Sequence, residues 1–147
     1  MAVLDDLLNK LDRVQKEVPK RVLPKIEPMM KLSLNQAMAD WYGSYEGAYQ
    51  RTGNFISVTH NPIISYGADS ITMTVSSDTM HDYPGIYSPL GADTAFDFMY
   101  MHGEHGHGRF QAAVSVPPDM LVSRDVESGF NGQVQALANA EVAKILG

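Results

Sequence analysis

Apolar residues recur at steps of three and four along the first turns of the chain. The members of this series are Val3, Leu4, Leu7, Leu8, Leu11, Val14, Val18 and Val22. Such spacing predicts an amphipathic helix that buries one apolar stripe. Each of the next three prolines removes a backbone donor, so we expect a kink or break between Pro19 and Pro28. A second helical stretch follows, which completes a helical region over residues 1–42 and stops at Gly43.

The period of the apolar pattern then changes from that of a helix to that of a strand. Between Asn54 and Thr59, and more clearly between Ser70 and Ser76, apolar residues alternate with polar ones, which predicts two β-strands. The turn-forming sequences Asn61-Pro62 and Tyr66-Gly67-Ala68-Asp69 lie between them, so we expect an antiparallel hairpin over residues 54–77. Two strands alone are marginal in water, and this sheet therefore needs support from the long helix or from another copy of the chain.

A long loop and a short helix are predicted next. Residues 79–93 hold two Pro, two Gly and two Tyr, and loops of this length are usually functional or linked to assembly. Asp93 can cap a short helix over residues 94–102, which ends at Gly103.

The C-terminal third reads mainly as helix. Residues 110–116 could form a third strand, which two prolines close. Pro118 suits the first turn of a helix, and helices interrupted at Gly129 and Gly132 are expected over residues 118–146. The predicted fold class is α+β, with a long broken N-terminal helix packed on a small antiparallel β-sheet and a helical C-terminal third.

Composition places the chain among globular proteins. Its 147 residues are 44% apolar and 19% charged, so we expect a single domain over residues 1–147 with its own core. The absence of cysteine excludes disulfides and thiolate metal sites. The N-terminus lacks the pattern of a signal peptide and no apolar run is long enough for a bilayer, so we expect a soluble protein synthesised inside the cell.

Charge is unevenly distributed along the chain. The net charge of −6 disfavours nonspecific nucleic-acid binding. Residues 1–31 hold seven Lys/Arg against five Asp/Glu, whereas residues 32–147 hold four against twelve. Ion pairs four residues apart on a solvated helix face explain the basic segment. Alternatively, the basic end of one copy meets the acidic remainder of a neighbouring copy.

Three histidines form the most conspicuous candidate site. His102, His105 and His107 lie within six residues, with Glu104 among them, in a glycine-rich segment. Imidazoles and a carboxylate this close can bind zinc or another transition metal. The spacing matches no catalytic pattern, and a polar loop whose histidines hydrogen-bond or face solvent explains the same residues. We therefore expect no metal and no cofactor, with these histidines as the candidates if one binds.

No other motif supplies catalytic chemistry. The sequence has no Gly-x-Ser-x-Gly elbow, no phosphate-binding loop and no dinucleotide fingerprint. We expect that the protein is not an enzyme. The alternative of another class is a small metal-binding or hydrolytic protein that uses the three histidines.

Aromatic residues and glycines concentrate in the segment from Trp41 to Phe55, which holds the only Trp, three of the seven Tyr and three Gly. This mixture fits a corner where a helix stops and a sheet begins, with the rings laid across the joint. The sequence Trp41-Tyr-x-Ser-Tyr, followed by Tyr49-Gln-Arg-Thr-Gly-Asn-Phe55, resembles the tail-completion, or neck, proteins of long-tailed (siphovirus-type) bacteriophages. Ile64-Ser-Tyr-Gly and Phe96-Asp-Phe-Met-Tyr-Met-His-Gly-Glu-His-Gly are similar to the hairpin and the short aromatic helix of that family.

The resemblance implies a structural virion protein, synthesised in the bacterial cytoplasm, that forms a homo-oligomeric ring in the neck and completes the tail. Its partners would be itself and other neck and tail proteins, such as an adaptor, a stopper, the tail terminator or the tail tube. Neither a membrane nor sequence-specific nucleic acid is implied. A role as tail terminator or minor capsid component is the alternative.

Assembly contacts are expected in the loops and turns, because the short sheet, the aromatic loop and the separated charge suit a subunit that neighbouring copies complete. The candidates are Arg51, Thr52, Asn54, Tyr83, Tyr87, His102, His105 and His107. A surface ion pair explains Arg51 equally well, and plain turn chemistry explains Thr52 and Asn54.

Overall fold

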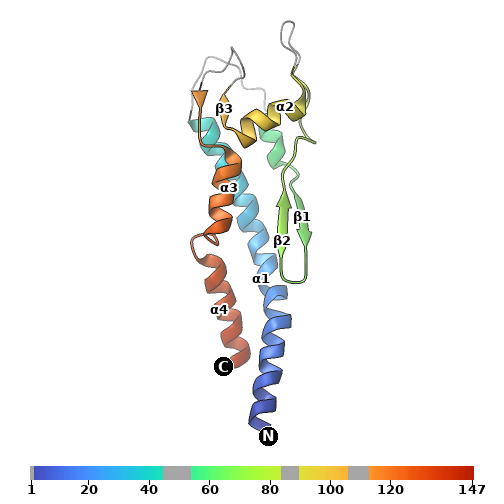
Figure 1. Cartoon of the computed structure of the whole chain (residues 1–147), viewed down its shortest axis with the longest axis vertical. Helices are drawn as coiled ribbons and strands as arrows, with labels where there is room; N and C mark the ends of the chain where they lie inside the picture. The colour runs from blue at the N-terminus through green and yellow to red at the C-terminus, as the bar shows by residue number, and fades with distance from the viewer. Residues whose placement is uncertain (1, 45–53, 84–89, 106–112) are drawn as a thin grey trace.

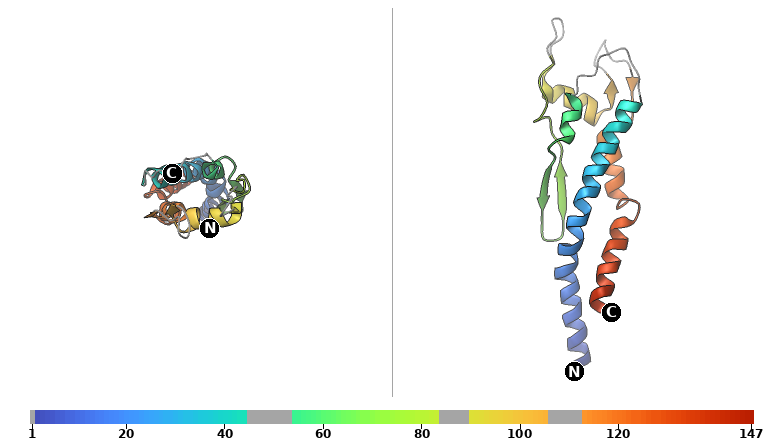
Figure 2. Two further views of the ribbon diagram at one scale, coloured as in Figure 1. Left: turned by 90° about the horizontal axis from the view of Figure 1, so that it is seen from above. Right: turned by 180° about the vertical axis from the view of Figure 1, so that it is seen from behind.

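The computed structural model describes residues 2–44, 54–83, 90–105 and 113–147 of an elongated α+β molecule (Figure 1). One helix, α1 (Ala2–Gly43), runs along most of its length. The hairpin of β1 (Ile63–Tyr66) and β2 (Ile71–Thr74) lies beside α1, and the helices α3 (Pro118–Glu127) and α4 (Gln133–Leu146) follow one another along it (Figures 1 and 2). The predicted fold class is therefore confirmed.

Helix α1 is continuous through Pro19, Pro24 and Pro28, so of the kink or break that we expected in this stretch, the break is wrong. Pro24 and Pro28 lie on the exposed side of the helix, where solvent can hydrogen-bond the carbonyls that their missing donors leave free. Residues on the other side are buried against the rest of the chain at steps of four: Val18, Val22, Ile26 and Met30. Packing along this face outweighs the local cost of the prolines.

The apolar stripe that the sequence predicted to be buried is buried only in part. Val18 and Val22 are in the core, and Val14 packs against its edge. The five members closest to the N-terminus are exposed, each to about half or more: Val3, Leu4, Leu7, Leu8 and Leu11. The prediction is wrong for these five, because α1 extends past the C-terminal end of α4, the helix that covers the same face further along (Figures 1 and 2).

The first strand of the hairpin lies later in the chain than predicted. Residues Phe55–Thr59 form a short 3-10 helix, η1, which places Phe55 and Val58 together in the core. The hydroxyls of Ser57 and Thr59 donate to the carbonyls three residues earlier, and such local bonds compete with strand pairing. The strand that pairs with β2 is β1, in the register Ile63 with Thr74 and Tyr66 with Ile71. The second predicted strand is confirmed.

Two helical segments follow the hairpin. They are α2 (Ala92–Phe96) and one π-helical turn, η2 (Asp97–Met101), which together confirm the predicted short helix. The predicted cap is wrong, because Gly91 precedes the first turn and the Asp93 carboxylate instead accepts a hydrogen bond from the Ser77 hydroxyl.

The chain then forms a second small sheet, whose strands are β3 (Glu104–His105) and β4 (Ala113–Val114). Only the last part of the predicted strand over residues 110–116 lies among the described residues. Helices α3 and α4 are confirmed, as is the interruption between them, where Gly129 and Gly132 have φ of 59° and 82°.

Two core clusters share α1. The first surrounds Trp41 and includes residues of η1, α2, η2 and α3. The second packs the middle of α1 against α4 and β2 around Ile26 and Ile145. Side-chain hydrogen bonds add two ties to α1, from Tyr66 of the hairpin to Glu27 at 3.0 Å and from Ser33 to Asp125 of α3.

Candidate functional site

The C-terminal end of α1 lies in a buried cluster of aromatic rings. The indole of Trp41 is 3% exposed and contacts Phe55 edge to face, with ring centroids 4.8 Å apart. On its other side it stacks on the imidazole of His105, with centroids 4.2 Å apart and planes 10° from parallel. The packed aromatic corner is therefore confirmed at the end of α1, with a histidine that the sequence pattern did not place there. The sheet that was predicted to begin at this corner does not, because Phe55 belongs to the 3-10 helix η1.

His105 also joins a network of two serine hydroxyls. Its Nε2 lies 2.7 Å from Ser115 Oγ and 3.2 Å from Ser44 Oγ, and the two hydroxyl oxygens are 2.6 Å apart. Ser44 donates its hydroxyl proton to the carbonyl of Trp41 at 2.7 Å, so it accepts from Ser115 or His105. The network ties the end of α1 to β3 and to the residue after β4.

The three candidate histidines are not brought together as a group in the described residues. His105 is 1% exposed, whereas the side chain of His102 is 62% exposed and its Nδ1 lies 3.1 Å from the carbonyl oxygen of Asp97. His107 lies outside the described residues. Across the four described ranges, no group of three or more His, Asp or Glu side chains is placed to hold a metal ion.

Two of the other expected assembly residues make contacts within the chain. The Asn54 side chain pairs with the backbone of His81, donating to its carbonyl at 2.8 Å and accepting from its N–H at 2.7 Å. Tyr83 is paired with Leu90 through two backbone hydrogen bonds, of 2.7 and 3.1 Å. Both contacts hold the base of the predicted loop. Arg51, Thr52 and Tyr87 lie outside the described residues.

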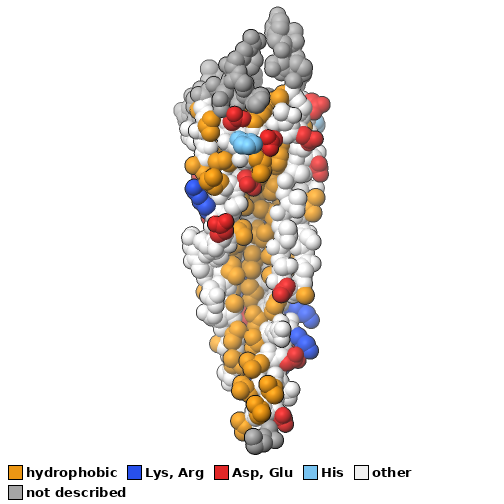
Figure 3. Space-filling model, viewed as in Figure 1, with side chains coloured by type: hydrophobic (Ala, Val, Ile, Leu, Met, Phe, Trp, Pro, Cys, Tyr) orange, Lys and Arg blue, Asp and Glu red, His pale blue; other side chains and the backbone are white. Residues whose placement is uncertain are grey.

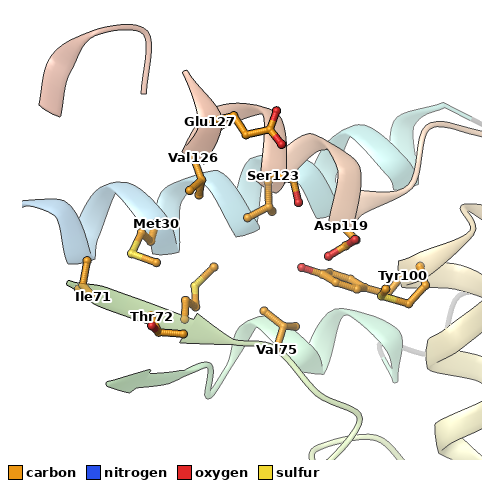
Figure 4. A pocket seen from close by; sticks show the side chains of 12 residues that line it. Met30, Ile71, Thr72, Val75, Tyr100, Asp119, Ser123, Val126 and Glu127 are labelled. Atoms are coloured by element: carbon orange, nitrogen blue, oxygen red, sulfur yellow. The ribbon is translucent and has the colours of Figure 1, made fainter. Parts of the chain in front are cut away.

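A groove opens between β2, η2 and α3, with Met30 of α1 at its floor (Figure 4). Its volume is about 430 Å³, within the range of sites that hold small molecules or side chains of a partner. Most of the side chains that line the groove are apolar, among them Ile71 and Val126, and Asp119 and Glu127 lie at its rim. Burial, and then the nearby negative charge of Asp119, raise the pKa of Tyr100 well above its usual range.

One buried carboxylate pairs with two basic residues of α1 and one of α4. Glu141 of α4 is 4% exposed and lies 3.1 Å from Lys144 Nζ, 3.4 Å from Lys25 Nζ and 3.4 Å from an Arg21 nitrogen. The hydrogen bond from Lys144, with those from Lys25 and Arg21, lowers the pKa of Glu141 although its burial opposes this. Part of the basic charge of α1 is therefore paired within the chain.

The exposed end of α1 is the largest departure from the predicted burial. We call Val3, Leu4, Leu7, Leu8 and Leu11 the N-terminal stripe. In Figure 3 a strip of apolar side chains runs down the molecule between the hairpin and the C-terminal helices and reaches this end. Contiguous apolar surface of this kind marks a binding surface, so the stripe is the strongest candidate for a functional site in the described part of the chain.

Comparisons with known proteins add no relative. The sequence matches no protein-family model, no curated protein and no solved structure. Among the helices that the structure describes, none combines the length and apolar character needed to cross a bilayer.

Proposed function

We propose that this chain is a structural subunit of the neck of a long-tailed bacteriophage, where copies of it form a ring that completes the tail. The observation that carries the proposal is the N-terminal stripe, in which Val3 is 86% exposed and the four leucines are 48 to 54% exposed. A subunit that works alone has no use for so much apolar surface at its tip, whereas a subunit of an assembly buries it against a neighbour.

Two further features support an assembly role. The length of α1 places its two ends at opposite ends of the molecule, so surfaces near each end can meet different neighbours (Figure 1). The sequence between Tyr49 and Phe55 resembles the neck proteins, and it follows the Trp41 corner directly. The resemblance supplies the phage context, and the stripe supplies the physical reason for assembly.

Deletion of the gene from the phage or prophage that encodes it tests the proposal. We expect filled heads and tails that do not join, seen by electron microscopy, and the protein in purified wild-type virions by mass spectrometry. Tails of irregular length would indicate the tail-terminator alternative, and defective heads the minor capsid alternative. Virions that lack the protein altogether would overturn all three roles.

A hydrolytic function is the second candidate, because Ser115 Oγ lies 2.7 Å from the buried Nε2 of His105. A histidine at this distance can act as a general base toward a serine hydroxyl. Labelling by a serine-reactive fluorophosphonate that Ser115→Ala abolishes, while Ser123→Ala retains it, would favour this candidate. The absence of labelling favours a structural role for the network.

A further inference from the structure

The N-terminal stripe continues a face of α1 that is already an interface. Leu4, Leu11 and Val18 are spaced by seven residues, as are Leu7 and Val14, and residues seven apart lie on the same side of a helix. Val14 and Val18 pack in the cluster that contains Ile145 of α4. The stripe is therefore the part of the α4-binding face that α4 does not reach.

The end of α4 can be placed against α1 from its contacts. Glu141 lies opposite Arg21 and Lys25, and α4 runs antiparallel to α1 (Figure 1). Leu146, five residues beyond Glu141, then lies near the level of Val18. Figure 2 shows the same relationship from behind, with the N-terminal end of α1 projecting past the C-terminus. The N-terminal stripe therefore lies just beyond the point where α4 ends.

We propose that the N-terminal stripe binds the N-terminal stripe of a second copy of this chain, with the two α1 helices antiparallel. In this arrangement Leu4 of one copy lies opposite Leu11 of the other, and the Leu7 and Leu8 side chains meet at the centre. The partner helix begins where α4 ends, so it takes the place that a longer α4 would occupy. A two-fold axis relates the copies, and the contact is reciprocal.

Sterics favour the antiparallel direction. A parallel partner helix would continue from the stripe along the same face of α1 and would meet α4, which already packs on Val18 and Val22. The N-terminus of an antiparallel partner helix lies next to the C-terminal end of α4. From there the partner helix runs along the stripe toward the N-terminus of α1 and continues beyond it, away from the rest of the first copy. The C-terminal end of α4 thus selects the direction of the partner.

This contact goes beyond the proposed function, because it does not require that the assembly belong to a virion. It also differs from the head-to-tail contacts of a ring. Two rings that met through their N-terminal tips would share it, and so would a free dimer. The groove between β2 and α3 is the rival acceptor for the stripe, since it is apolar and open.

Disulfide trapping tests the pairing directly, because the full chain contains no cysteine and each substitution introduces a single thiol. Mild oxidation of a mixture of Leu4→Cys and Leu11→Cys should give a disulfide-linked dimer of the two variants, identified by peptide mass spectrometry. Either variant alone should give little. A dimer from Leu4→Cys alone would show parallel helices and overturn the proposal. A disulfide between Leu7→Cys and Val126→Cys copies would assign the stripe to the groove and also overturn it.

A matched pair of variants tests the energetics. Leu7→Lys/Leu8→Lys places two charges in the stripe and should weaken self-association by roughly a hundredfold or more, measured by analytical ultracentrifugation. Asn9→Lys/Asp12→Asn changes the net charge by the same amount on the polar side and should leave association unchanged. All four side chains are exposed, so circular dichroism should show folded protein in both cases. Equal self-association constants for the two variants would overturn the pairing of the stripes. The proposed neck function is tested separately, by the phenotype of the gene deletion.

Discussion

The indole ring of Trp41 lies flat against the imidazole of His105, with their centroids 4.2 Å apart, and the edge of Phe55 closes the indole from another direction. Within the described chain, the indole Nε1 is buried without a hydrogen-bond partner. Trp41 therefore stabilises the corner through packing and not through its polar atom.

Replacement of Trp41 by alanine should destabilise the protein by about 3–5 kcal/mol, the usual range for a truncated buried aromatic residue. Trp41→Phe should cost much less, because it keeps most of the ring contacts and removes an unpaired donor. Urea unfolding followed by circular dichroism measures both. A change below about 0.5 kcal/mol for Trp41→Ala would contradict the packed corner.

The hydrogen bonds of His105 can be separated from its stacking. His105→Phe keeps an aromatic ring against Trp41 and loses the contacts to Ser44 and Ser115, so we expect a loss of about 1 kcal/mol. His105→Ala removes the ring as well and should cost clearly more. If both variants unfold at the same denaturant concentration, the stack contributes nothing measurable.

Acid should weaken the junction between α1 and α4. The pKa of Glu141 is lower in the folded protein than in the unfolded chain, so its contribution is complete above about pH 4.3. It is lost as the pH falls through the lower, folded value. We expect the difference in melting temperature between wild type and Glu141→Gln to be present at pH 7 and to shrink toward pH 3. A difference that is independent of pH would contradict the charge cluster.

Alkali should act through Tyr100. Burial raises its pKa above that of an unfolded tyrosine, so its contribution is complete below about pH 10 and decreases as the pH rises further. A spectrophotometric titration at 295 nm should show one tyrosine that ionises later than the rest, or only on unfolding. Tyr100→Phe should remove that component. Its persistence in the variant would assign the late ionisation to another residue.

Chelation should leave both fold and assembly unchanged. His102 faces solvent beside Asp97 while His105 packs on Trp41, so the two do not converge on one ion. Light scattering and thermal melting with and without EDTA are expected to coincide. A monomer that holds stoichiometric zinc, or an assembly that dissociates with EDTA, would contradict this expectation.

The sequence pattern predicted the fold class, the C-terminal helices and the end of α1, because these depend on local signals. Gly43 and the glycines after α3 interrupt long apolar periods, and Pro118 opens a helix. The pattern failed where tertiary packing overrides local preference. Burial of Ile26 and Met30 against the rest of the chain carries α1 through its prolines, and no window of a few residues contains that contact.

Less of the candidate site could be predicted from the sequence. The apolar period from Val3 to Leu11 was visible, but whether it is covered depends on where α4 ends, more than a hundred residues later. The stack of His105 on Trp41 joins two distant segments in the same way. A signal did exist for the hairpin, since Ile63 and Ile64 precede the Tyr66 turn closely enough to be its partner strand.

The length of α1 has a mechanical consequence. A helix of 42 residues spans about 60 Å, and in this molecule it is stiffened along its middle by α4 and the hairpin. Whatever binds near Leu7 is therefore held at a set separation from whatever binds beside Trp41. The protein can therefore set the distance between two neighbours. Inserting or deleting whole turns of α1 would change that distance without changing the contact near Leu7 or the contact beside Trp41.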